Sequence, residues 1–115
     1  MKVTFSLNDV GGPSAGLAFA TALVEKLGEE NLLRGRNVAM TGEIDAAGNV
    51  GAIGGMTQKM ASAARNGATL MLFPRENCPI SRERVPDELT IVPVSTLSEA
   101  IEALRLTDST KYPTC

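Results

Sequence analysis

A serine in a glycine-rich turn is the first residue of this chain that could do chemistry. Ser14 stands in the segment Gly11–Gly16, which reads G-G-P-S-A-G. Glycines let backbone N–H groups approach a ligand, and the start of the helix that follows favours negative charge. A serine nucleophile needs that environment, with donors for a developing oxyanion. On this segment alone a helix N-cap is the commoner role, and an anion-binding nest is a third interpretation.

The absence of histidine limits which residue could activate that serine. The chain contains no His, which excludes Ser-His-Asp and Cys-His catalysis and zinc sites with histidine ligands. The remaining candidate bases are lysines and carboxylates, and Lys59 is distinctive because it borders a predicted apolar helix face formed by Met56, Met60 and Ala63. Partial burial there would favour the neutral amine, which is the form that accepts a proton. A lysine that keeps its ammonium in water is the commoner alternative.

Hydrophobic patterning predicts the elements that would position these residues. Strands are expected over residues 3–7, 37–44, 49–53, 69–73 and 90–94, and helices over 14–27, 56–66 and 97–104. The first helix is apolar around most of its circumference, so we expect it to be largely buried. The apolar run at 69–73 predicts a strand covered on both faces, and Pro93 favours a sheet edge for the last strand.

The length and composition of the chain are typical of one folded domain. The chain has 115 residues, 43% of them hydrophobic, and a net charge of −2, which offers no electrostatic footprint for nucleic acid. The predicted order of strands and helices is β-α-β-β-α-β-α. This order indicates an α/β domain of the layered α+β type. We expect this domain to span residues 1–106 and residues 107–115 to form a flexible tail.

Two cysteines, Cys78 and Cys115, are too few to build a structural metal site by themselves. They are far apart in sequence and the second ends the chain, so we interpret both as free thiols. A disulfide between them stays open as an alternative, and cysteine usage leaves the cellular compartment undetermined.

Three segments carry motifs that are specific when found together. They read V-G-G-P-S-A-G-L over 10–17, M-T-G-E-I over 40–44 and V-G-A-I-G-G-M-T-Q-K over 50–59, and P-R-E-N follows over 74–77. In this order and spacing they resemble the proteolytic domain of Lon-type serine proteases, over about residues 3–104. The resemblance implies a Lon proteolytic-domain fold and a serine endopeptidase with a Ser-Lys dyad.

The resemblance also implies roles for particular residues. The family's nucleophile falls on Ser14 and its general base on Lys59, while Thr41 of the Thr-Gly-Glu motif is expected to support and orient the dyad. Gly12 and Pro13 are the backbone positions expected at the oxyanion site. No metal or other cofactor is implied, and no ATPase motif is present in these residues, so the expected proteolysis is independent of ATP.

Departures from the ATP-dependent pattern favour one branch of the family. Gly11 stands where those proteases usually carry an acidic residue, and residues 50–55 read V-G-A-I-G-G where they usually have Val-Leu-Pro-Ile-Gly-Gly. With Glu-Asn-Cys at 76–78, these differences resemble bacterial Lon-like proteases that carry a PDZ domain and a membrane anchor. We therefore expect a C-terminal fragment of a longer, membrane-anchored bacterial protein, with this domain otherwise cytoplasmic.

The expected partner of the domain is a peptide or an unfolded protein substrate, and we expect no nucleic acid partner. The family forms rings, commonly hexamers, whereas this short chain is expected to be a monomer or a weak homo-oligomer.

Two rival interpretations of the chain's function stay open. The chain could be a non-catalytic module that binds a peptide or anion or serves assembly, or it could be an inactive fragment of a larger protease.

Overall fold

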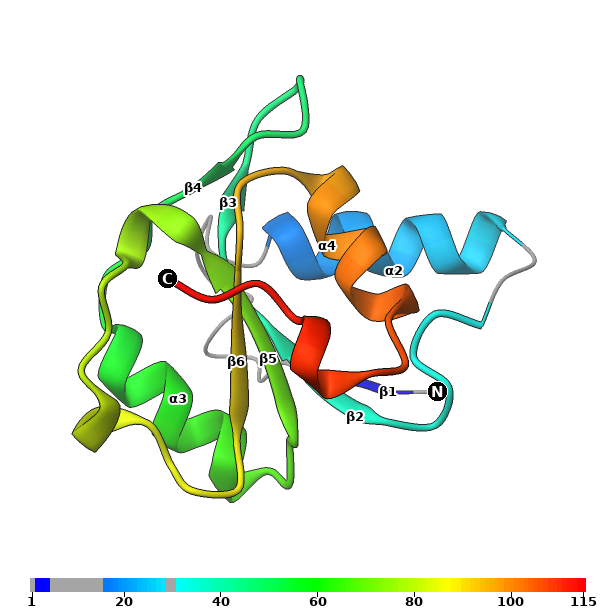
Figure 1. Cartoon of the computed structure of the whole chain (residues 1–115). Helices are drawn as coiled ribbons and strands as arrows, with labels where there is room; N and C mark the ends of the chain where they lie inside the picture. The colour runs from blue at the N-terminus through cyan, green and yellow to red at the C-terminus, as the bar shows by residue number, and fades with distance from the viewer. Residues whose placement is uncertain (1, 5–15, 29–30) are drawn as a thin grey trace.

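The computed structural model describes residues 2–4, 16–28 and 31–115. These residues form strands in groups that are separated by helices (Figure 1). In order they are β1 (Lys2–Thr4), α2 (Gly16–Leu27), β2 (Asn37–Met40), β3 (Glu43–Ile44), β4 (Val50–Gly51), α3 (Met56–Arg65), β5 (Leu70–Pro74), β6 (Thr90–Val94) and α4 (Leu97–Arg105), with 3-10 turns η2 (Arg75–Asn77), η3 (Arg82–Arg84) and η4 (Ser109–Lys111).

Four of the strands form one parallel sheet in the order β1-β2-β5-β6. The expected position of the strand with Pro93 is confirmed, because β6 lies at the edge of this sheet. The strand expected over 37–44 divides after Met40, where the chain turns at Gly42 with a φ of 151°. The second part, β3, pairs with β4 in an antiparallel hairpin. The expected order β-α-β-β-α-β-α therefore lacked a separate strand for β3, and it also left out the strand predicted over 90–94, which is β6.

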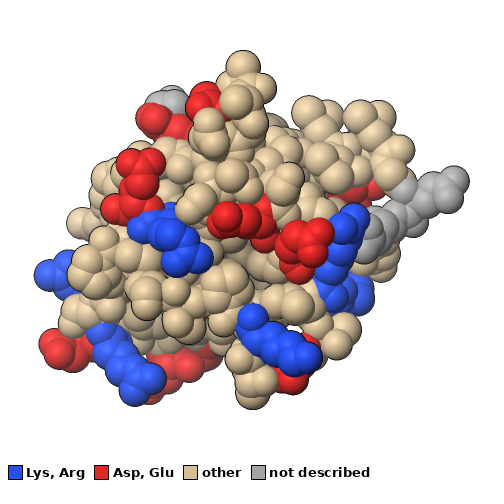
Figure 2. Space-filling model, turned by 45° about the horizontal axis from the view of Figure 1, so that its top comes forward, with Lys and Arg blue, Asp and Glu red and all other residues tan. Residues whose placement is uncertain are grey.

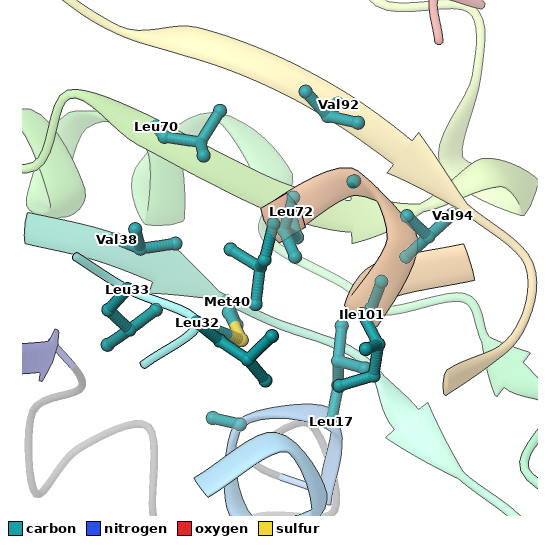
Figure 3. Close-up of a cluster of buried hydrophobic side chains, with 14 of the residues drawn as sticks. Leu17, Leu32, Leu33, Val38, Met40, Leu70, Leu72, Val92, Val94 and Ile101 are labelled. Carbon is teal, nitrogen blue, oxygen red and sulfur yellow. The ribbon is translucent and has the colours of Figure 1, made fainter. Parts of the chain in front are cut away.

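Helices cover both faces of the sheet, which makes a mixed α/β fold of three layers. Side chains of α2 and α4 pack on one face, where Leu70 and Leu72 of β5 join the larger core cluster (Figure 3). On the opposite face Met71 of β5 packs with Met60 and Ala63 of α3. The alternation along β5 sends successive side chains to opposite faces, and all five residues of this strand are buried. The prediction of a strand covered on both faces is confirmed.

The prediction that the first helix is largely buried was wrong. The described part of that helix, α2, buries a stripe formed by Leu17, Ala18 and Thr21, whereas Leu23 is 58% and Leu27 84% exposed. A helix that lies on one face of a sheet covers it with one stripe only, so apolar residues on its other sides stay outside the core. Residues 5–7 of the expected first strand and 14–15 of the expected helix lie outside the described residues.

The interpretation of the two cysteines as free thiols was also wrong. Cys78 and Cys115 form a disulfide with a Cα–Cα distance of 5.7 Å, although 37 positions separate them in sequence. The end of the chain crosses β6 to reach η2, so distance in sequence does not reflect distance in space (Figure 1).

Residues 107–115, expected to be a flexible tail, include the 3-10 turn η4. The Tyr112 hydroxyl in this segment accepts a hydrogen bond of 3.1 Å from Arg36.

Candidate active site

The described residues of the candidate site lie at the carboxyl edge of the parallel sheet. Parallel strands end on the same side, so β2 and β5 deliver the segments that follow them to one edge (Figure 1). The residues after β2 are Thr41 and Gly42, and η2 follows β5. Ligands of open α/β sheets usually bind outside this edge of the sheet.

The first turn of α2 is fixed to this edge by a backbone hydrogen bond. The N–H of Leu17 donates to the carbonyl oxygen of Gly42 over 3.0 Å. Gly16, where α2 begins, lies so close to β3 that an added Cβ would be 2.9 Å from the Cγ2 atom of Ile44. A side chain at Gly16 would force Ile44 to shift, so the glycine allows the start of α2 to lie close to β3.

Gly42 lies where segments from all four motifs meet. A Cβ added at Gly42 would lie 2.7 Å from Cγ1 of Val50, 3.3 Å from Cγ of Pro74 and 3.6 Å from Cβ of Leu17. Val50 opens the motif that ends at Lys59, Pro74 opens P-R-E-N, and Leu17 closes the motif that contains Ser14. Motifs spread over 68 positions, from 10 to 77, are thus assembled around one glycine.

Lys59 lies in the first turn of α3. Its backbone N–H donates to the carbonyl of Gly55 over 3.0 Å, and Gly55 precedes the helix in a left-handed conformation with a φ of 70°. The side chain is partly buried beside Met60, which is completely buried on the same helix. The expectation that Lys59 stands at the border of an apolar helix face is confirmed.

Thr41 is buried, with 4% of its surface exposed, and it extends the contact between β2 and β5 by one residue. Its backbone N–H donates to the carbonyl of Leu72 over 3.1 Å. It immediately precedes Gly42, so Thr41 belongs to the described part of the site. Ser14, Gly12 and Pro13 lie outside the described residues, and the roles predicted for them stay predictions.

The sequence did not indicate how Asn77 contacts the segment before α3. Its amide oxygen accepts a hydrogen bond of 3.0 Å from the N–H of Ile53, and its amide nitrogen donates one of 2.8 Å to the Ile53 carbonyl. The one signal that could have drawn attention to Asn77 is its position, three residues after a buried strand at the carboxyl edge.

The turn of the β3–β4 hairpin holds a carboxylate, Asp45, whose pKa is lowered by hydrogen bonds. The Asp45 carboxylate accepts hydrogen bonds from the backbone N–H groups of Asn49 and Ala47 over 2.8 and 2.9 Å. These bonds, that of Asn49 first, hold the pKa of the Asp45 carboxyl below its usual value. Two further bonds of 2.8 Å join the hairpin to the β6–α4 connection, from Val50 to Ser95 and from Leu97 to Gly48. The hairpin is therefore firmly attached to the sheet.

The family described as "Lon protease (S16) C-terminal proteolytic domain" matches residues 9–107 of the chain. This match covers most of the 115 residues. The chain belongs to the Lon proteolytic domain family. All four motifs of the candidate site fall inside the matched range.

Curated relatives of this Lon domain come from both fungi and bacteria. The chain is 42% identical to "Lon protease homolog, mitochondrial" of Candida dubliniensis over 81% of its own length. It is 40% identical to "Lon protease" of an aster yellows witches'-broom phytoplasma over 76%, and 41% identical to "Lon protease" of Rhizobium meliloti over 78%. The aligned part spans only 9%, 11% and 11% of these relatives.

The described part of this Lon domain has neither a metal cluster nor a membrane helix. Across residues 2–4, 16–28 and 31–115, no group of three or more His, Cys, Asp or Glu side chains could hold a metal ion. Within the same residues, each helix is too short or too polar to cross a bilayer. Acidic and basic side chains alternate on the face shown in Figure 2, without a broad patch of one sign.

Proposed function

We propose that this chain carries the catalytic residues of a Lon-type serine endopeptidase, with Ser14 as nucleophile and Lys59 as general base. The proposal is supported by membership of the Lon proteolytic domain family and by the assembly of the motif segments around Gly42. Gly16 is two residues from Ser14, and covalent geometry keeps two such Cα atoms within about 7 Å. The hydrogen bond from Leu17 to Gly42 supports the proposal, because it ties the start of α2, just after Ser14 in sequence, to the carboxyl edge of the sheet.

The proposed reaction is acyl transfer through a serine ester. The neutral amine of Lys59 takes the proton of the Ser14 hydroxyl while its oxygen attacks the carbonyl carbon of the peptide bond. The lysine ammonium then gives that proton to the leaving amine as the C–N bond breaks. Water, activated by the same amine, attacks the ester and releases the acid product together with free Ser14.

The oxyanion of the tetrahedral intermediate needs backbone donors near the serine. The start of α2 offers a favourable helix dipole, but the N–H of Leu17 is already bonded to Gly42. Pro13 has no N–H, so its contribution is to fix the backbone. We therefore assign the donors to backbone amides of the turn from Gly12 to Ser14.

Thr41 is proposed to orient the dyad. Its burial and its position before Gly42 place it on the segment that contacts both α2 and the motif leading to α3. A hydroxyl fixed there can restrict how the reacting groups turn toward each other. We keep it as a supporting residue and assign it no proton transfer.

The proposed substrate is a peptide or an unfolded polypeptide, cleaved without ATP. The residues at positions 11 and 50–52 support an origin in the PDZ-linked, membrane-anchored branch of Lon-like proteases. We propose a monomer or weak homo-oligomer for the isolated chain. These statements concern the whole protein. In the curated relatives, the part aligned with this chain makes up about a tenth of the sequence.

The proposal is tested by cleavage of a quenched fluorescent peptide library. Ser14→Ala and Lys59→Ala should each abolish cleavage and leave the circular dichroism spectrum and melting temperature close to those of the parent. Lys26→Ala, on α2, is the matched control and should retain activity. Cleavage that persists in Ser14→Ala contradicts the dyad. Peptide binding without any cleavage by the parent supports the non-catalytic module instead.

A further inference from the structure

The side chain of Asn77 pairs with both backbone polar groups of Ile53. The amide oxygen accepts from the Ile53 N–H over 3.0 Å, and the amide nitrogen donates to the Ile53 carbonyl over 2.8 Å. A primary amide has the donor and acceptor spacing of a peptide group, so one asparagine can replace a neighbouring strand. This pair is the kind of two-point contact that fixes both position and rotation of a backbone segment.

Ile53 is in the short connection between β4 and α3. The connection spans residues 52–55, and an added Cβ at Gly54 would meet no atom within 4 Å, so neighbouring groups do not crowd this part of it. Gly55 adopts a φ of 70°, and its carbonyl accepts the backbone N–H of Lys59 over 3.0 Å. The contact at Ile53 is therefore followed by two glycines and then by the turn of α3 that carries Lys59. Glycines alone would leave the start of this helix free to shift.

The other side of the contact is held by the central strand and the disulfide. Asn77 ends η2, which follows the fully buried strand β5. The next residue, Cys78, is bonded to Cys115, and the Arg75 guanidinium donates to the carbonyl of Pro93 over 3.4 Å. Asn77 therefore joins the segment after the buried strand β5 to the connection before α3, which contains two glycines.

We propose that Asn77 is a positioning residue that sets the start of α3 and, through it, the amine of Lys59 relative to Ser14. This inference rests on the proposed function for its catalytic consequence only. Lys59 must reach a hydroxyl within hydrogen-bond distance, and a displacement of about 1 Å can reduce the rate by roughly 100-fold. Loss of the Asn77 contact should therefore lower kcat and leave KM nearly unchanged, because the peptide itself does not touch Asn77 in this scheme.

The test compares Asn77→Ala and Asn77→Asp with Asn66→Ala. Asn66 is the control, because its side chain is also bonded to backbone, by a single bond of 2.9 Å to the Ser62 carbonyl, but at the far end of α3. Asp at 77 keeps the acceptor for the Ile53 N–H and loses the donor. We expect kcat to fall by roughly 10-fold to 100-fold in both Asn77 variants and to stay within twofold in Asn66→Ala.

A second readout keeps the inference testable if the parent cleaves no peptide. The chain has four lysines, so a ¹³C-lysine spectrum gives few signals, and the Lys59 signal is assigned with Lys59→Arg. The Asn77 variants should shift the Lys59 side-chain signal and increase hydrogen exchange at the Ile53 amide, and Asn66→Ala should change neither. An unmoved Lys59 signal in folded Asn77→Asp, or an equal loss of kcat in Asn66→Ala, overturns the inference. A parent without Ser14-dependent cleavage would overturn the proposed function alone.

Discussion

The backbone N–H of Leu17 donates a hydrogen bond of 3.0 Å to the carbonyl oxygen of Gly42. This bond joins the start of α2 to the turn between β2 and β3, two segments that are 25 positions apart in sequence. It uses a donor that a helix start normally leaves without a partner inside the helix. The bond therefore fixes the start of α2 against the turn at Gly42, a position that also lies close to Val50 and Pro74.

Substitution of Gly42 by Ala should destabilise the domain strongly. Its φ of 151° disfavours a side chain, and the new Cβ would be 2.7 Å from Val50 and 3.3 Å from Pro74. We expect a loss of roughly 2–4 kcal/mol in the free energy of unfolding, measured with urea. Gly35→Ala is the control, because Gly35 also has a positive φ of 76° but no atom within 4 Å of an added Cβ, and should cost about 1 kcal/mol. Equal losses in the two variants would contradict close packing at Gly42.

Substitution of Thr21 by Val should stabilise the domain. The Thr21 hydroxyl is buried against the core and finds no hydrogen-bond partner among the described residues. A methyl group of the same size removes the cost of burying that hydroxyl, so unfolding should require about 1 kcal/mol more. Thr57→Val, on the exposed face of α3, should change stability by less than about 0.5 kcal/mol. A less stable Thr21→Val protein would show that the hydroxyl has a partner.

Loss of the disulfide should destabilise the domain through the unfolded state. The bond between Cys78 and Cys115 closes a loop with a sequence separation of 37, which corresponds to about 3–4 kcal/mol of lost chain entropy. Cys78→Ser with Cys115→Ser should lower the free energy of unfolding by that amount in denaturant titrations. A reductant should have the same effect on the parent and none on the double variant. An unfolding midpoint of the parent that does not change with the reductant would contradict a stabilising disulfide.

The hairpin turn at Asp45 should weaken in acid. Hydrogen bonds from Asn49, through its backbone and then its side chain, and from the N–H of Ala47 hold the pKa of Asp45 below its unfolded value of about 3.9. The stabilising effect is therefore complete above about pH 4 and is lost as the pH falls through the folded pKa. The difference in unfolding free energy between the parent and Asp45→Ala should be constant from pH 5 to 7 and shrink below pH 4. A difference that stays constant down to pH 2 would contradict this assignment.

Most strands and helices could be predicted because their patterns are local. The buried run of β5 and the helix expected over 97–104, which is α4, are examples. The start of α4 is fixed locally, since the Thr96 hydroxyl accepts the Glu99 N–H over 3.1 Å. The division of residues 37–44 into two strands depends on a contact of Gly42 with three distant segments. The exposed side of α2 and the disulfide also depend on long-range packing, which a local pattern does not contain.

The candidate site could be predicted by residue type and only partly by geometry. Lys59 was expected at the border of an apolar helix face, and α3 places it there because Met60 faces the core. The contact of Asn77 with Ile53 could not be predicted, because it joins residues 24 positions apart through a side chain and a backbone. The spacing of residues in the sequence shows which of them share a helix face. The contact between Asn77 and Ile53 depends instead on how the segments after β5 and after β4 run in space.

Covalent labelling tests the central claim most directly, since it requires both members of the proposed dyad. The chain is incubated with a fluorophosphonate, a serine-reactive electrophile, and the adduct is located by mass spectrometry of its peptides. We expect one adduct on Ser14, faster labelling as the pH rises from 7 to 9, and at least 100-fold slower labelling in Lys59→Met. Labelling of Ser14 at an unchanged rate in Lys59→Met, or an adduct that persists in Ser14→Ala, would contradict the Ser14–Lys59 dyad.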